Sequence, residues 1–113
     1  MHEEKKCGQI NIVITGDNYL RIMNKKYLGR DYYTDVITFD YSDKDVISGD
    51  LYISLERVRE NGLTYGEGEE RELLRVMVHG LLHLAGYEDR KDKEKKIMRD
   101  KEEKYLKLFM LSE

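Results

Sequence analysis

Three short stretches of the chain are rich in apolar, β-branched residues, and glycine or polar residues bound them. This composition is typical of strands, which the sequence predicts at residues 9–15, 35–41 and 50–54. The polar segment 42–49 between the last two is a short loop, and such a loop connects only antiparallel neighbours. The first two strands are joined through a helix and are expected to be parallel. The sheet is therefore predicted to be mixed.

Helical spacing of apolar residues marks the two segments that follow the first and third strands. In the first of these segments Asp17 stands where an N-cap belongs, and Gly29 supplies the stop. Ser54 can cap a short second helix that runs to about Asn61 and is closed by Gly62. We therefore expect one helix after each of these strands.

A further helix, predicted at residues 69–85, is apolar on nearly every face beyond its acidic first turn. A helix of this kind belongs in the protein interior. The last predicted helix, residues 92–111, begins heavily charged and ends apolar. Because the chain has no repeat, no proline and no low-complexity linker, residues 1–113 are expected to form one domain. The predicted fold class is α+β, with a small mixed sheet packed against helices.

Composition narrows the class of protein. Charged residues make up 38% and hydrophobic residues 40%, as in a soluble globular protein. No apolar run reaches the ~18 residues of a membrane span, and the charged N-terminus does not resemble a signal peptide. A lone cysteine, Cys7, agrees with a reducing compartment, so we expect a cytoplasmic protein that does not enter the membrane. The net charge of −3 does not indicate nucleic-acid binding, which would have to depend on local cations.

The candidate chemistry lies at the end of the predicted buried helix. His79 and His83 are four residues apart, so both imidazoles share one helix face, about one turn apart. They could be ordinary core histidines bonded to backbone, but buried polar rings need partners, and one metal ion satisfies both. Gly86 can turn the chain back and bring Asp89 to the same ion. Two imidazoles, a carboxylate and an open position describe a catalytic zinc site.

The segment HGLLHLAGYED, residues 79–89, resembles the signature of the YbeY family, which in most members reads H-G-x-L-H-L-x-G-Y-D-H. Residues 27–41 and 48–62 are similar to the family segments Y-R-G-K-D-x-x-T-D-V-L-S-F and L-G-D-I-x-I-S. The resemblance implies a metal-dependent endoribonuclease that is specific for single strands. It also implies a role in small-subunit ribosomal-RNA maturation and ribosome quality control, with the small ribosomal subunit as partner. The metal, one zinc ion, would lie at the C-terminal end of the signature helix.

Two departures from the family pattern affect the expected site. Asp89 replaces the third family histidine; aspartate is a competent zinc ligand, and the neighbouring Glu88 is an alternative. Leu28 stands where the family has arginine, so Arg30 is the residue expected to contact the scissile phosphate. Further candidate cations for RNA are Lys25, Lys26, Arg57 and Arg59.

Two other functions remain open at this point. The histidine spacing, H-x-x-x-H-x-x-G, also occurs in metzincin peptidases, but those enzymes carry a glutamate base directly after the first histidine. Gly80 occupies that position here and can supply no base. The other alternative is a non-catalytic zinc-binding ribosome-assembly factor in which the metal is structural.

Overall fold

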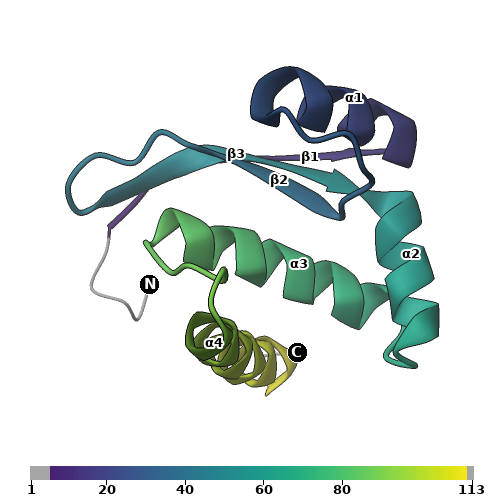
Figure 1. The fold of residues 1–113 in the computed structure, drawn as a ribbon. Helices are drawn as coiled ribbons and strands as arrows, with labels where there is room; N and C mark the ends of the chain where they lie inside the picture. Colours follow the sequence, from purple (N-terminus) through teal and green to yellow (C-terminus); the bar gives the residue numbers. More distant parts are fainter. Residues whose placement is uncertain (1–5, 112–113) are drawn as a thin grey trace.

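The computed structural model describes residues 6–111 and consists of one small sheet and four helices (Figure 1). The elements in chain order are β1 (Lys6–Thr15), α1 (Asp17–Leu28), β2 (Val36–Asp40), β3 (Val46–Ser54), α2 (Leu55–Thr64), α3 (Glu69–Leu84) and α4 (Asp92–Leu111). None of the helices within this range has the length and apolar character needed to cross a bilayer. The α+β fold class is confirmed.

The three strands lie in the order β1-β3-β2. β3 runs parallel to β1 and antiparallel to β2, so the predicted mixed sheet and the antiparallel pairing of β2 with β3 are confirmed. The expected parallel relation of the first two strands is wrong. β1 and β2 occupy opposite edges and run in opposite directions, because β3 enters between them and takes the central position.

β3 also begins earlier than predicted, at Val46, so half of the expected loop is strand. The chain reverses in a tight turn, with Asp43 and Val46 exchanging backbone hydrogen bonds. Polar residues of the strand alternate with buried ones, and the backbone N–H of Ser48 donates to the Ser42 hydroxyl at 3.0 Å. This alternation is what a strand requires, but in the sequence it reads as a polar loop.

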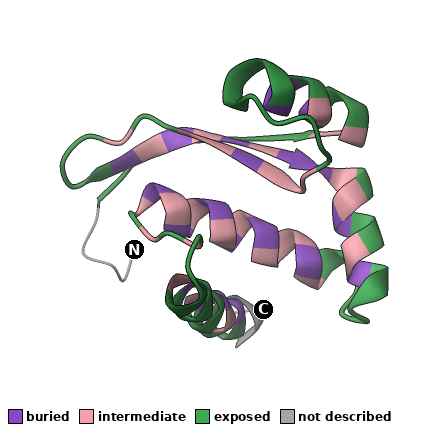
Figure 2. Ribbon diagram, viewed as in Figure 1, coloured by how far each residue is buried: buried purple, intermediate pink, exposed green. Residues whose placement is uncertain are grey.

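Helices cover both faces of the sheet (Figure 1). α1 packs Leu20 against Ile37 on one face, while α3 packs Leu84 against Leu51 on the other. α4 lies against the far side of α3. Every residue from 71 to 85 is buried or half-buried (Figure 2), which confirms the interior position predicted for this helix.

The N-cap of the first helix lies one residue earlier than predicted. Gly16 is the N-cap and Asp17 is already helical, so the predicted capping role of Asp17 is wrong. The Asp17 carboxylate instead accepts hydrogen bonds from the Ser54 hydroxyl at 2.6 Å and the Arg57 guanidinium at 2.9 Å. These bonds connect α1 to the start of α2. Gly29 ends the helix with φ 67°, as predicted.

The start of α2 agrees with the prediction, but its end does not. The Ser54 hydroxyl caps the helix by accepting from the Arg57 backbone N–H. Gly62 was expected to close the helix near Asn61, yet the helix continues to Thr64. A Cβ at position 62 would lie 2.8 Å from the carbonyl oxygen of Gly68. Glycine is needed here for a close approach of two chain segments, not for a helix stop.

Candidate metal centre

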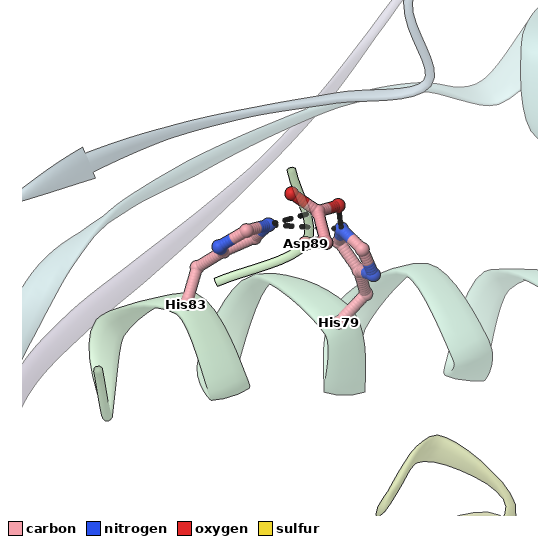
Figure 3. Close-up of side chains that lie close together, drawn as sticks. All are labelled: His79, His83 and Asp89. Carbon is pink, nitrogen blue, oxygen red and sulfur yellow. Dashed lines mark hydrogen bonds and ion pairs between the residues drawn. The ribbon is translucent and has the colours of Figure 1, made fainter. Parts of the chain in front are cut away.

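Both histidines lie on one side of α3, in its last two turns, and one nitrogen of each ring points toward the other ring (Figure 3). The Nε2 atoms of His79 and His83 are 3.0 Å apart. This convergence follows from the four-residue spacing on a helix, because one full turn carries the second ring above the first. The site therefore lies at the C-terminal end of the buried helix, as predicted.

The chain then folds back over the two rings. Gly86 follows α3 with φ 105°, a conformation that suits glycine. The turn brings an oxygen of Asp89 to 3.3 Å from Nε2 of His79 and 3.5 Å from Nε2 of His83 (Figure 3). These three side chains make up the candidate metal group, and Glu88 is not part of it.

The other ring nitrogen of each histidine is also occupied. Nδ1 of His83 lies 3.0 Å from the backbone oxygen of Tyr87, and Nδ1 of His79 lies 2.5 Å from a carboxylate oxygen of Glu102. Both partners accept hydrogen bonds, so both Nδ1 atoms donate. The Nε2 lone pairs then face each other, which is unfavourable unless a proton or a metal cation lies between them. Metal-binding histidines usually donate a hydrogen bond from the ring nitrogen that does not bind the metal, as both Nδ1 atoms do here.

Charge around His79 favours a cation. Burial of the ring works against protonation, but the hydrogen bond and negative charge of Glu102, with contributions from Asp89 and Asp35, outweigh it and raise the pKa of His79. The negative groups that stabilise a proton on this ring also stabilise a metal ion beside it. Glu102 comes from α4, far along the chain, and the spacing of residues around the histidines gave no sign of it.

The donor set fits a zinc ion. Tetrahedral zinc with bonds of ~2.0–2.2 Å to nitrogen and oxygen places its ligand atoms roughly 3.3–3.6 Å apart. The three donor pairs of His79, His83 and Asp89 are separated by 3.0, 3.3 and 3.5 Å. Small shifts of the side chains would therefore bring all three atoms to zinc distance. A site with three protein ligands retains a position for water or substrate, as catalytic zinc sites do.

The histidines line an open cleft of about 1190 Å³ between the β2 edge and the segment that follows α3. Arg30, the residue expected to contact phosphate, lines the same cleft, and so does Leu28. The other candidate cations do not line it. Arg57 pairs with Asp17 and Arg59 with Glu69, so these two serve structural ion pairs.

Three further arginines of the cleft escaped the sequence analysis, namely Arg75, Arg90 and Arg99. Arg75 lies within salt-bridge distance of Glu72, Glu102 and Glu103. No ion pair with another described residue holds Arg90 or Arg99. Arg90 directly follows Asp89, which was the one available signal for it, whereas Arg99 reaches the cleft only through the packing of α4.

Asp35 is a second feature of the cleft that the sequence did not indicate. It stands immediately before β2 and lines the cleft. Burial raises the pKa of its carboxyl, although the positive charge of His79 and backbone hydrogen bonds partly oppose the shift. Of the cleft residues, Asp35 is therefore a carboxyl suited to holding a proton near the metal group.

Fold and site together define a small α+β protein with a histidine-histidine-carboxylate group in an arginine-lined cleft. A family model described as Endoribonuclease YbeY matches residues 1–110. A protein of that name from Flavobacterium psychrophilum is 51% identical over 109 residues, which cover 96% of this chain and 78% of that protein. A Chlorobium phaeobacteroides protein of the same name is 49% identical and is covered to 69%. The chain belongs to the YbeY family, whose members are named endoribonucleases, that is, enzymes that hydrolyse RNA.

A solved structure supports the fold as well. The solution structure of a Thermotoga maritima protein superposes with a TM-score of 0.63 at 37% identity. The match covers 86% of this chain and 65% of that one, so the present chain spans less than two thirds of the Thermotoga chain.

Proposed function

We propose that the protein is a metal-dependent endoribonuclease that cuts single-stranded RNA, with one zinc ion held by His79, His83 and Asp89. The observation that carries the proposal is the convergence of two Nε2 atoms and one carboxylate oxygen within 3.5 Å, in a cleft that also contains Arg30. Zinc supplies hydrolases with activation of water and polarisation of a phosphoryl oxygen.

The protein's own residues orient the metal ligands, transfer a proton and bind the phosphate. Glu102 and the Tyr87 carbonyl orient the two rings, and Asp35 can take or give a proton in the cleft. Arg30 contacts the scissile phosphate, where a guanidinium stabilises negative charge that develops during cleavage. Family membership supports a place in small-subunit ribosomal-RNA maturation and quality control in the cytoplasm, with the small ribosomal subunit as partner.

The peptidase alternative is weakened by the surroundings of Gly80. A Cβ at this position would lie 2.5 Å from a methyl carbon of Leu51 on β3, so a glutamate base does not fit there. The position that metzincins use for catalysis is instead the contact between α3 and the sheet.

The test combines metal analysis with cleavage assays on the purified protein. We expect bound zinc and cutting of single-stranded RNA, and no cutting of duplex RNA or casein. His83→Ala should abolish both zinc binding and cutting, and Asp89→His should keep the metal. Full metal retention in the His79→Ala, His83→Ala double variant would contradict the site. Bound metal without RNA cleavage would favour the assembly factor.

Arg30→Ala tests the phosphate contact separately from the metal. It should keep the zinc, raise the KM for RNA by about tenfold, as expected for loss of one charged hydrogen bond, and reduce the salt dependence of binding. Arg59→Ala is the matched control, because Arg59 pairs with Glu69 and does not line the cleft. Leu28→Arg adds a cation to the cleft and should keep or increase activity.

A further inference from the structure

Two tyrosines line the same cleft as the metal group. Tyr32 lies between α1 and β2, and Tyr65 follows the end of α2. The two residues are 51% and 67% exposed. One exposed tyrosine is ordinary on a protein surface. Two on one cleft that also holds a candidate catalytic group call for a more specific explanation.

Neither of these two tyrosine rings has an aromatic or cationic partner among the residues that the structure describes. Tyr33, although also exposed, lies beneath the guanidinium groups of Arg21 and Arg57, at 5.1 and 5.5 Å. Among the described residues, no aromatic ring or cation lies over the ring of Tyr32 or Tyr65. Because both residues are also more than half exposed and line the cleft, their rings are accessible to a ligand that enters it.

Cations are available in the same space. Arg30, Arg90 and Arg99 line the cleft, and none of them is paired with another described residue. Several cleft carboxylates are neutralised locally, since Glu67 and Glu103 bond to Arg71 or Arg75, and Glu102 bonds to His79. Free guanidinium groups beside free aromatic faces are how proteins bind the phosphates and the unpaired bases of single-stranded nucleic acid.

We propose that Tyr32 and Tyr65 stack on unpaired bases of the strand whose phosphate lies at the metal group. Arg30 binds that phosphate, while Arg90 and Arg99 hold further phosphates of the same strand. The two tyrosines thereby determine the preference for single strands, because bases in a duplex are already stacked and paired and offer no free face. This inference rests on the proposed ribonuclease function and adds the residues that select the substrate.

The test measures binding of a short, labelled, single-stranded oligoribonucleotide in the presence of a chelator, so that no cutting occurs. Tyr32→Ala and Tyr65→Ala should each weaken binding on the order of tenfold, the usual effect of losing one base stack. Phe or Trp at either position should retain binding, and Leu should not. Tyr19→Ala is the matched control, because Tyr19 is 54% exposed but does not line the cleft. An RNA with abasic sites should bind the wild type weakly and be indifferent to the tyrosine substitutions.

The outcomes separate this inference from the function on which it rests. A wild type that binds and cuts single-stranded RNA, with alanine variants that bind as tightly as Tyr19→Ala, overturns the stacking role alone. Leucine variants that bind like phenylalanine variants also overturn it, because apolar bulk would then suffice. A wild type that neither binds nor cuts RNA overturns both. Weaker binding in both alanine variants, with a smaller ratio of single-strand to duplex affinity, supports it.

Discussion

Glu102 and Glu103 follow one another on α4, but only the first contacts the candidate metal group. Glu102 is 7% exposed and lies 2.5 Å from Nδ1 of His79, whereas Glu103 faces Arg71 and Arg75. Carboxylates in the position of Glu102 fix the tautomer of a metal-binding histidine and make it a better ligand. Comparing substitutions at the two positions therefore distinguishes an effect on the metal group from an effect on the surrounding ion pairs.

Glu102→Gln should weaken zinc affinity by about 10- to 100-fold, the range seen when such outer partners are removed. Glutamine keeps the shape of the side chain but removes the charge that favours a cation beside His79. Competition against a chromophoric chelator measures the affinity directly. Glu103→Gln, the control, should leave it unchanged. Equal weakening by both substitutions would show that Glu102 acts only through the ion pairs of Arg75.

How far the site could be predicted depends on where its residues come from. His79 and His83 follow from helix geometry alone, and Asp89 follows from a single turn at Gly86. Glu102 lies on another helix, and its approach to His79 depends on how α4 packs against α3. Such a contact has no periodic signature in the sequence, so it became visible only in the structure.

α3 and β3 approach each other more closely than side chains normally allow. At Gly80 a Cβ would lie 2.5 Å from Cδ2 and 2.8 Å from Cγ of Leu51, which is fully buried. In an exposed helix a change from glycine to alanine gains about 1 kcal/mol of helix stability. Here the added methyl group overfills the core, so the sign should reverse.

Gly80→Ala should lower the free energy of unfolding by about 1–3 kcal/mol, the usual cost of overpacking. Urea denaturation of the chelated protein measures this change. In a double-mutant cycle, Leu51→Ala supplies space for the new methyl group, so the double variant should lose less than the sum of the single losses. Additive losses, or a stabilised Gly80→Ala, would contradict the proposed close contact.

The elements themselves were largely predictable, but their arrangement was not. Within residues 6–111, local patterns located the four helices and three strands to within a few residues. β3 occupies the centre of the sheet because, after the antiparallel turn from β2, it also pairs with β1. The function of Gly62 was hidden for a similar reason, because its close neighbour, Gly68, belongs to the next loop. The strand order and the close approach at Gly62 both depend on contacts between separate segments of the chain. The spacing of residues within one segment therefore does not predict them.

Two carboxyl groups, Asp35 inside the cleft and Asp17 outside it, have opposite effects on the stability of the whole molecule. Burial raises the pKa of Asp35, which lines the cleft. Asp17, which ties α1 to α2, has a lowered pKa: partial burial opposes its charge, but hydrogen bonds from Ser54 and Arg57 outweigh that effect. A buried carboxyl that disfavours its own charge is a cost to the fold that a catalytic role would explain.

Asp35→Asn should therefore stabilise the chelated protein at neutral pH. A carboxyl whose folded pKa is raised contributes its full stability below the unfolded value, near 3.8, and loses it as pH rises through the folded value. The raised pKa costs folding free energy once both states are ionised, and asparagine avoids that cost. Urea denaturation at a series of pH values should show the gain at pH 7 and its disappearance toward pH 3.8.

Asp17→Asn is the control with the opposite expectation. The pKa of Asp17 is lowered, so this variant should be less stable than the wild type at pH 7, and the deficit should vanish as pH falls below 3.8. If Asp35→Asn is instead less stable at pH 7, attraction to His79 outweighs burial, and the carboxyl is held in its charged form.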